Sequence, residues 1–380
     1  MMGFIYPKYN GESIINIYDS VLSFFGGSGK RPLKNDLRTG RKLVLIIIDA
    51  LGISTLEHAF PEVVEYYEKN TITSVFPSTT AAAMLSFYTG MAPGEHGVLG
   101  FTSYIKELGT IVNMLGLSHP SQREQLPLLK HDFRSYLGTN SSPIGERLCE
   151  IGVKSKAILP VSLIGTPIST YTTSGMVRIP YHTIWDAMSL LKKELASNNG
   201  VYITLYISTV DTLSHIYGPY SEEVKNATKD ILKAINKTLS ETRGYTAIIT
   251  ADHGQSYNEI THICDQELFS MLEMPPFGDA RAVYMKTYNE EKVIKYFENK
   301  FPKFKMYYKK DAIEQHLFGD NFNIDRFSDR IGDIIAIPES NESLVYQFKG
   351  NLDTEYISLK GHHGGLTTEE QEVPLLIMRK

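Results

Sequence analysis

Three aspartates stand where short apolar stretches of the sequence end. Each follows a segment rich in Val, Ile and Leu, and they are Asp49, Asp211 and Asp252. In a parallel sheet the carboxyl ends of the strands meet at one edge, and ligands collect there. If the three apolar segments are strands of one sheet, the carboxylates come together at that edge. A single aspartate at a strand end can equally cap a turn, so the argument depends on the set.

Histidines accompany these aspartates. His215 lies four residues after the second aspartate, and an acid and a histidine at that spacing share one face of a helix and can bind one metal ion. His253 directly follows the third aspartate, which places an oxygen and a nitrogen donor side by side. His362 and His363 stand among glycines near the C-terminus, where two histidines have little packing purpose. The sequence therefore offers a mixed set of carboxylate and imidazole ligands.

A cluster of hydroxyl side chains precedes a run of alanines. Ser78, Thr79 and Thr80 are followed by three alanines at 81–83, a pattern typical of a helix start. The simplest interpretation is that one hydroxyl caps the helix. However, a hydroxyl in the first turn also lies where unpaired amides and the helix dipole favour an anion. A phosphate bound there would be within reach of that hydroxyl.

The charges of these side chains predict two metal ions. Three carboxylates in one crevice would repel one another strongly, and two divalent cations would leave the site near +1, suited to a phosphate anion. Mixed Asp and His ligands favour Zn²⁺ or Mn²⁺ over Mg²⁺ or Ca²⁺, which prefer oxygen ligands. Two metals can stabilise the attacking and leaving oxygens of an in-line displacement, and a cation beside a threonine activates its hydroxyl as a nucleophile.

The elements that position these residues alternate between strand and helix. We expect strands at 43–48, 154–159, 201–208 and 245–250, each a nearly continuous apolar run of the kind found in a sheet covered on both faces. Helices are expected at 184–196, with an apolar stripe of Trp185, Met188, Leu191 and Leu195, and at 221–242, with a stripe of Val224, Ile231, Ile235 and Leu239. The alternation predicts an α/β fold with a mainly parallel central sheet between helices.

A second, smaller unit is expected near the C-terminal third. A strand at 280–285, a helix at 290–299 and a strand at 305–308 indicate a small α+β insertion over residues 272–330. The catalytic core would then comprise residues 1–271 and 331–380. The insertion could form part of the substrate pocket or an oligomer contact.

Composition and charge exclude several other classes of protein. The net charge is −5 and no basic block stands out, so a nucleic-acid groove has no electrostatic support. Cys149 and Cys264 are far apart without CxxC spacing, and we expect both to be buried structural residues. No stretch predicts a signal peptide or a membrane span, and the chain is expected to be cytoplasmic.

Seven segments together resemble the type I phosphodiesterase/nucleotide pyrophosphatase family of the alkaline phosphatase superfamily. Each motif alone is modest, but their order along residues 43–380 is specific. They are Asp49, Phe-Pro-Ser-Thr-Thr at 76–80, Tyr-Thr-Gly-Met-Ala-Pro at 88–93, Glu-His-Gly at 95–97, Asp211-x₃-His215, Asp252-His253-Gly254 and His363-Gly364-Gly365.

The resemblance implies an alkaline phosphatase-like sandwich and a role for each matching residue. Thr80 would be the nucleophile, favoured over Ser78 and Thr79 by its register with the motifs, and His363 rather than His362 would be the ligand. One metal would be held by Asp49, Thr80, Asp252 and His253, and the other by Asp211, His215 and His363. The implied reaction is hydrolysis of a small-molecule phosphodiester or nucleotide pyrophosphate through a phospho-threonine intermediate.

The chain also departs from the family pattern. Relatives carry an asparagine shortly after the nucleophile that contacts the phosphate, whereas the matching position here is Ala83, and Asn113 is a candidate substitute. No equivalent is found of the arginine with which alkaline phosphatases bind a monoester, which favours diesters. The alternatives are a phosphomonoesterase or phosphonate hydrolase on the same core, a phosphomutase-like transferase, or a non-catalytic relative that binds phosphate or nucleotide. His96 is expected to pack at a turn.

Overall fold

A seven-stranded sheet forms the centre of the molecule. The computed structural model describes residues 3–62, 66–122, 124–127, 133–138, 142–196, 200–348 and 359–380. The strand order of the central sheet is β2-β17-β8-β1-β7-β5-β6. Its strands are β1 (Lys42–Ile48), β2 (Glu68–Thr73), β5 (Ser155–Pro160), β6 (Val177–Tyr181), β7 (Val201–Ile207), β8 (Thr246–Thr250) and β17 (Glu372–Arg379).

Most of this sheet is parallel, as the sequence predicts. β1 pairs in parallel with β7 and β8, and β5 pairs in parallel with β7 and β6. The last strand, β17, runs antiparallel to β8 and β2. The strands that precede Asp49, Asp211 and Asp252 are therefore β1, β7 and β8, three adjacent strands that end at one edge.

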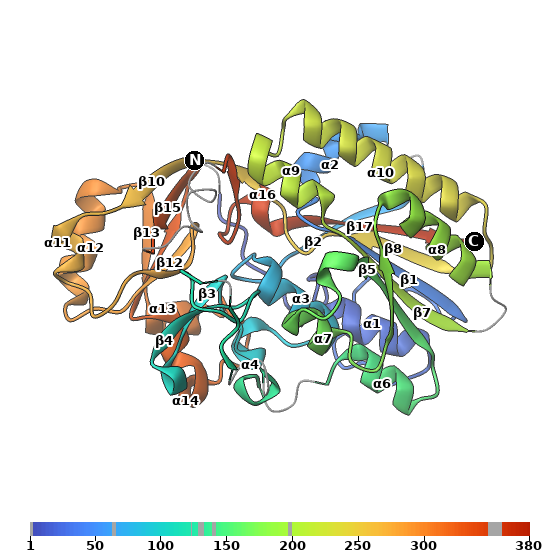
Figure 1. Cartoon of the computed structure of the whole chain (residues 1–380), viewed down its shortest axis with the longest axis horizontal. Helices are drawn as coiled ribbons and strands as arrows, with labels where there is room; N and C mark the ends of the chain where they lie inside the picture. The colour runs from blue at the N-terminus through green and yellow to red at the C-terminus, as the bar shows by residue number, and fades with distance from the viewer. Residues whose placement is uncertain are drawn as a thin grey trace.

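Helices cover both faces of the sheet (Figure 1). On one face α10 packs against its neighbours α2, α8 and α9, and on the other α3 packs against α1, α6 and α7. Their bounds are α1 (Asn16–Phe24), α2 (Ile53–Ala59), α3 (Thr80–Thr89), α6 (Ile144–Glu150), α7 (Pro167–Thr172), α8 (Ile184–Ala196), α9 (Thr209–Tyr217) and α10 (Glu222–Ser240). The short helices α4 (Pro93–His96) and α16 (Thr368–Gln371) lie beside α3 and α2.

The predicted helices form, with one error in a buried stripe. In α10 the Ser221 side chain caps the helix by accepting a hydrogen bond from the Val224 N–H, and the four expected apolar residues are buried. In α8, Met188, Leu191 and Leu195 are buried, but Trp185 is 66% exposed. The prediction that Trp185 is buried was wrong. Trp185 lies in the first turn of α8, before the first buried residue of the helix.

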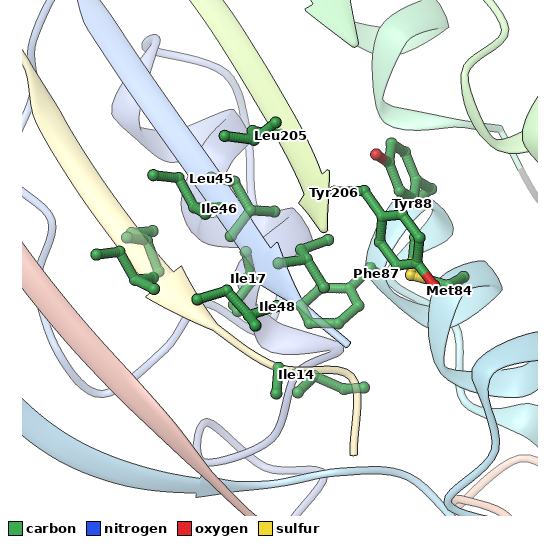
Figure 2. Close-up of a cluster of buried hydrophobic side chains, with 14 of the residues drawn as sticks. Ile14, Ile17, Leu45, Ile46, Ile48, Met84, Phe87, Tyr88, Leu205 and Tyr206 are labelled. Carbon is green, nitrogen blue, oxygen red and sulfur yellow. The ribbon is translucent and has the colours of Figure 1, made fainter. Parts of the chain in front are cut away.

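The first turn of α3 is fixed by the packing of the rest of that helix. Every residue of α3 after Thr80 is buried. Figure 2 shows Met84, Phe87 and Tyr88 of α3 beside residues of β1 and β7, with Ile14 and Ile17 of the N-terminal segment nearby. Because this core is close-packed, a side chain at the start of α3 has little freedom to move relative to the ends of β1 and β7.

A smaller unit, which includes α11 and α12, lies at the opposite end of the molecule from α8 (Figure 1). Its four-stranded antiparallel sheet has the order β11-β12-β14-β13. A separate parallel pair is formed by β10, which precedes this sheet in the sequence, and β15, which follows it. Its elements are β10 (Glu259–Ile263), α11 (Gln266–Phe269), β11 (Phe277–Asp279), β12 (Ala282–Met285), α12 (Glu290–Lys300), β13 (Phe304–Tyr308), α13 (Lys309–Glu314), α14 (Ile324–Phe327), β14 (Ile334–Pro338) and β15 (Glu342–Tyr346). β14 lies beyond residue 330, so this sheet uses residues on both sides of the expected boundary.

The remaining strands are a hairpin and a short pair. The hairpin is β3 (Thr102–Ile105) with β4 (Thr110–Asn113), and the pair is β9 (Ser256–Tyr257) with β16 (Gly361–His362). Cys149 and Cys264 are both exposed, so the prediction that they are buried was wrong. Each lies at the surface of its unit, Cys149 on the outer face of α6 and Cys264 after β10. Among the described residues, no helix combines the length and apolar character needed to cross a membrane.

Candidate active site

Strand order brings the three aspartates together. Asp49 follows β1 directly, Asp252 follows β8 by two residues, and Asp211 lies in the first turn of α9, just after β7. Because β1 lies between β8 and β7 in the sheet, these residues share one crevice. All three carboxylates are largely shielded from solvent.

One group of potential ligands contains two carboxylates and an imidazole. Asp49, Asp252 and His253 each offer an atom within 4.8 Å of the other two. His253 Nε2 lies 3.6 Å from Asp49 Oδ1 and 3.4 Å from Asp252 Oδ2. Thr80 belongs to the same group, because its Oγ1 lies 3.1 Å from His253 Nε2. These four residues match the first ligand set implied by the sequence.

A second group adjoins the first. Asp211, His253 and His363 also offer atoms within 4.8 Å of one another. Asp211 Oδ1 lies 3.2 Å from His215 Nε2 and 3.8 Å from His363 Nε2. The rings of His253 and His363 stack with their centroids 3.8 Å apart. The second predicted set therefore assembles too, and of the two competing histidines it is His363 whose Nε2 reaches Asp211.

The histidine rings are oriented by backbone carbonyls. His215 Nδ1 lies 2.7 Å from the carbonyl oxygen of Gly361. His253 Nδ1 lies 3.0 Å from the carbonyl oxygen of Gly254. His363 Nδ1 lies 2.9 Å from the carbonyl oxygen of Ser78. A carbonyl oxygen only accepts, so each Nδ1 carries the proton and donates it. The Nε2 atoms of all three rings face the aspartates. This arrangement is characteristic of imidazoles that bind a metal through Nε2.

The aspartates have the unpaired oxygens that a cation would satisfy. Among the described side chains, Asp49 Oδ1, Asp211 Oδ1 and Asp252 Oδ2 are buried without a hydrogen-bond partner. Burial raises the pKa of Asp49, and the charges of Asp252 and Asp211 raise that pKa further. Burial acts in the same direction on Asp211, but the neighbouring imidazole of His215 outweighs it and lowers the pKa of Asp211. Buried carboxylates that repel one another fit a site for divalent cations.

Of the three clustered hydroxyls, only that of Thr80 faces this crevice. Thr80 is the first residue of α3 and is partly exposed. Ser78 is fully buried, and its hydroxyl donates to the Gly365 carbonyl oxygen at 2.9 Å. Thr79 is buried at the N-cap position of α3. Only Thr80 therefore combines solvent access, a helix N-terminus and contact with the ligand cluster.

Ser78 joins the loop of the predicted nucleophile to the loop of His363. Its hydroxyl accepts a hydrogen bond from the Gly364 N–H, and its carbonyl accepts one from His363. Gly364 has a φ of +123°, and a Cβ there would lie 2.6 Å from the Cβ of Asp279. A side chain at Gly364 would thus be strained and obstructed, which accounts for a glycine directly after His363.

Sequence reasoning missed Tyr206. Its hydroxyl is buried and donates a hydrogen bond to Asp49 Oδ2. The sequence alone carries no clear signal for this contact, because β7 also contains Tyr202 and Thr204, and the pairing of Tyr206 with Ile47 of β1 is known only from the structure. Tyr206 holds one oxygen of Asp49 and leaves the other for the ligand cluster.

Asn113, the candidate phosphate contact, has its amide oxygen engaged in a turn. Its Oδ1 accepts hydrogen bonds from the amides of Leu115 and Gly116 and closes the turn after β4. Asn113 lines a different cavity from Thr80. Ala83 is completely buried in α3, so no side chain at the position of the family's asparagine reaches a substrate. The position of Asn113 in the sequence could not reveal that its side-chain oxygen accepts hydrogen bonds from the backbone of the following turn.

His96 packs as predicted. It is fully buried between α3 and α4, with Nε2 3.0 Å from the Ser86 hydroxyl, and its Nδ1 accepts from the Val98 N–H.

Comparison of the sequence with known protein families identifies the family of this chain. A sequence model of the type I phosphodiesterase/nucleotide pyrophosphatase family matches residues 43–366. The chain belongs to this family. Its relatives are hydrolases of phosphate esters, and so is this chain. No match was found among curated proteins.

Solved structures share the fold at low sequence identity. Murine ectonucleotide pyrophosphatase/phosphodiesterase 5 has a TM-score of 0.65 and 16% identity, covering 88% of this chain and 87% of its own. An inactive variant of that murine protein was solved in complex with AMP. Phosphonoacetate hydrolase from Sinorhizobium meliloti 1021, in complex with phosphonoacetate, has a TM-score of 0.63 and 15% identity, covering 90% of both chains. These likenesses confirm the alkaline phosphatase-like architecture.

Proposed function

We propose that this chain is a two-metal phosphodiesterase that cleaves a phosphate diester through a covalent phospho-threonine. The observation that carries the proposal is the position of Thr80. Its Oγ1 stands at the N-terminus of α3, 3.1 Å from His253 Nε2, beside two groups of potential ligands that share this histidine. Asp49, Thr80, Asp252 and His253 would hold one divalent ion, and Asp211, His215 and His363 the other.

The proposed reaction consists of two displacements at phosphorus. Thr80 Oγ1 bonds to phosphorus while the bond to the leaving oxygen breaks, and the threonine proton ends on the departing alcohol. Water then attacks phosphorus, the bond to Thr80 breaks, and the hydroxyl regains a proton. The free amides in the first turn of α3 favour the phosphate anion. Two successive displacements retain the configuration at phosphorus.

The metals would supply charge neutralisation and an activated threonine hydroxyl. Imidazole and carboxylate donors in one site favour Zn²⁺, with Mn²⁺ as the second choice. A preference for diesters is supported by the wall around Thr80, where no described arginine offers a contact for the additional charge of a monoester.

The proposal is tested by hydrolysis of bis-p-nitrophenyl phosphate and p-nitrophenyl phosphate with added Zn²⁺ or Mn²⁺. We expect the diester to be the better substrate, Thr80→Ala to lower its kcat by at least about 10³-fold because the covalent step is lost, and chelation to abolish turnover. Thr79→Ser is the matched control and should retain activity. Full activity in Thr80→Ala would reject the nucleophile, and a strong monoester preference would move the assignment to a phosphatase.

A further inference from the structure

A second cavity lies between the smaller unit and the β3–β4 hairpin, apart from the catalytic crevice. Its volume is about 360 Å³, within the range of pockets that hold a small organic molecule. β11 packs against β3 beside it, and β10, β12 and β15 supply further lining residues. The turn after β4 separates it from the cavity at Thr80, because Leu115 lines the cavity at Thr80 and its neighbour Gly116 lines the second cavity. None of the described residues that line the second cavity is a predicted metal ligand.

Aromatic rings form much of the wall of this second cavity. Phe277, Tyr346 and Phe348 line it, and the rings of Tyr346 and Phe348 meet edge to face with their centroids 4.8 Å apart. The face of an aromatic ring carries a negative partial charge and attracts cations. Among the described lining residues, none is Lys, Arg or His. The wall therefore favours a cation that comes from a ligand.

One carboxylate stands in this aromatic lining. Asp279, the last residue of β11, is 7% exposed and lines the cavity, and its Oδ2 accepts a hydrogen bond from the Phe101 N–H at 3.1 Å. Burial raises the pKa of Asp279 to about 7, although hydrogen bonds from that N–H and from the Thr79 hydroxyl lower it. Arg281, two residues further along the chain, is paired with Glu370 instead. A carboxylate accepts about four hydrogen bonds, so Asp279 retains capacity for a cationic donor.

We infer that the second cavity binds a small organic ammonium compound, with its apolar body among the aromatic rings and its N–H donors on Asp279. Such a ligand gains both a counter-charge and the ring faces, whereas an anion would meet a buried carboxylate without a cation to balance it. Binding at this site is separate from turnover at Thr80. The inference is therefore independent of the proposed function.

Binding of 2-phenylethylammonium and of neutral 2-phenylethanol to the protein supplied with Zn²⁺ tests the inference. The two probes share a phenyl group and differ in the charge of the head group. In calorimetric titrations at pH 8, above the pKa of Asp279, we expect the Kd of the ammonium to be about 10-fold lower than that of the alcohol. Asp279→Asn should abolish this preference. Glu273→Gln is the matched control, because Glu273 is an exposed acid of the same unit that does not line the cavity, and it should keep the preference.

A second variant is placed on the aromatic wall, because Asp279 also contacts the catalytic loops. A Cβ at Gly364, directly after His363, would lie 2.6 Å from the Cβ of Asp279. Tyr346→Leu keeps an apolar side chain and removes the ring. We expect it to raise the Kd of the ammonium about 3-fold and to leave that of the alcohol unchanged. Tyr288→Leu, at an exposed position outside the lining, should bind both probes as the wild type does.

Separate results would overturn the inference and the proposed function. Equal affinity for the two probes would overturn the inference, and so would a preference that survives in both Asp279→Asn and Tyr346→Leu. Excess inorganic phosphate should leave ammonium binding unchanged, and displacement by phosphate would place the ammonium in the catalytic crevice instead. Failure to cleave bis-p-nitrophenyl phosphate would reject the proposed function and leave these binding results standing.

Discussion

The Tyr206 hydroxyl is a single group that determines how Asp49 meets the ligand cluster. It holds Asp49 Oδ2, while Oδ1 is left 3.6 Å from His253 Nε2. We expect Tyr206→Phe to weaken Zn²⁺ binding at the proposed site of Asp49, Asp252 and His253 by about 10–100-fold, because the carboxylate of Asp49 would lose the donor that orients it. Titration of the apo-protein with Zn²⁺ against a chromophoric chelator measures this affinity directly.

Tyr88→Phe provides the matched control. Tyr88 is also a buried tyrosine, but its hydroxyl donates to Thr204 Oγ1 at 3.1 Å and touches no aspartate. Its loss should leave metal affinity unchanged. Equal affinities in both variants and the wild type would show that Tyr206 does not position Asp49.

At the scale of elements, His96 connects helices α3 and α4 in a way that makes stability depend on pH. Its Nδ1 accepts from the Val98 N–H, so its neutral Nε2–H donates to Ser86 of α3. Burial lowers the pKa of His96 from 6.5 to about 3, and the nearby Arg330 lowers it too. As the pH falls below 6.5, the unfolded chain binds a proton that the native chain excludes, so stability is lost. The expected loss is about 2 kcal/mol between pH 7 and pH 5.

His96→Asn should flatten this dependence, because asparagine keeps an acceptor for the Val98 N–H and does not titrate. Urea unfolding of the chelated protein at pH 5, 6 and 7 would measure the difference in slope. His262→Asn, at an exposed position, is the control and should keep the wild-type slope. If His96→Asn also keeps it, His96 is not the group responsible.

Most elements that carry the site could be predicted because their signals are local. A continuous apolar run ending in aspartate defines β1 and the position of Asp49 without knowledge of the rest of the chain. The contribution of Tyr206 depends instead on the pairing of β7 with β1, which a single sequence does not reveal. The hydrogen bonds of Asn113 could not be predicted for a similar reason, because they depend on the turn after β4, which uses its amide oxygen. Trp185 has the helical spacing of the buried residues of α8, but it lies in the first turn of the helix, before the first buried residue.

At the scale of the whole molecule, one buried ion pair joins the smaller unit to the core. Arg281, directly before β12, donates through Nε and Nη2 to Glu370 of α16 at 2.7 and 2.9 Å, and both side chains are fully buried. The remaining N–H groups of Arg281 bond to Asn258 and to the carbonyls of Ser340 and Glu342. Glu370 in turn accepts from the Gly365 N–H, two residues after His363. The pair therefore links the smaller sheet to the loop that carries a predicted ligand.

Arg281→Met should lower the free energy of unfolding by about 3–5 kcal/mol, because Glu370 would remain buried without a counter-charge. Adding Glu370→Gln should restore part of that loss, since the amide still accepts from Gly365 but carries no charge. Lys303→Met breaks an exposed pair with Glu342 and should cost no more than about 1 kcal/mol. Guanidinium unfolding of the three variants measures these differences. A double variant less stable than Arg281→Met would show that the charge of Glu370 is satisfied by other groups, and that packing rather than this pair joins the two units.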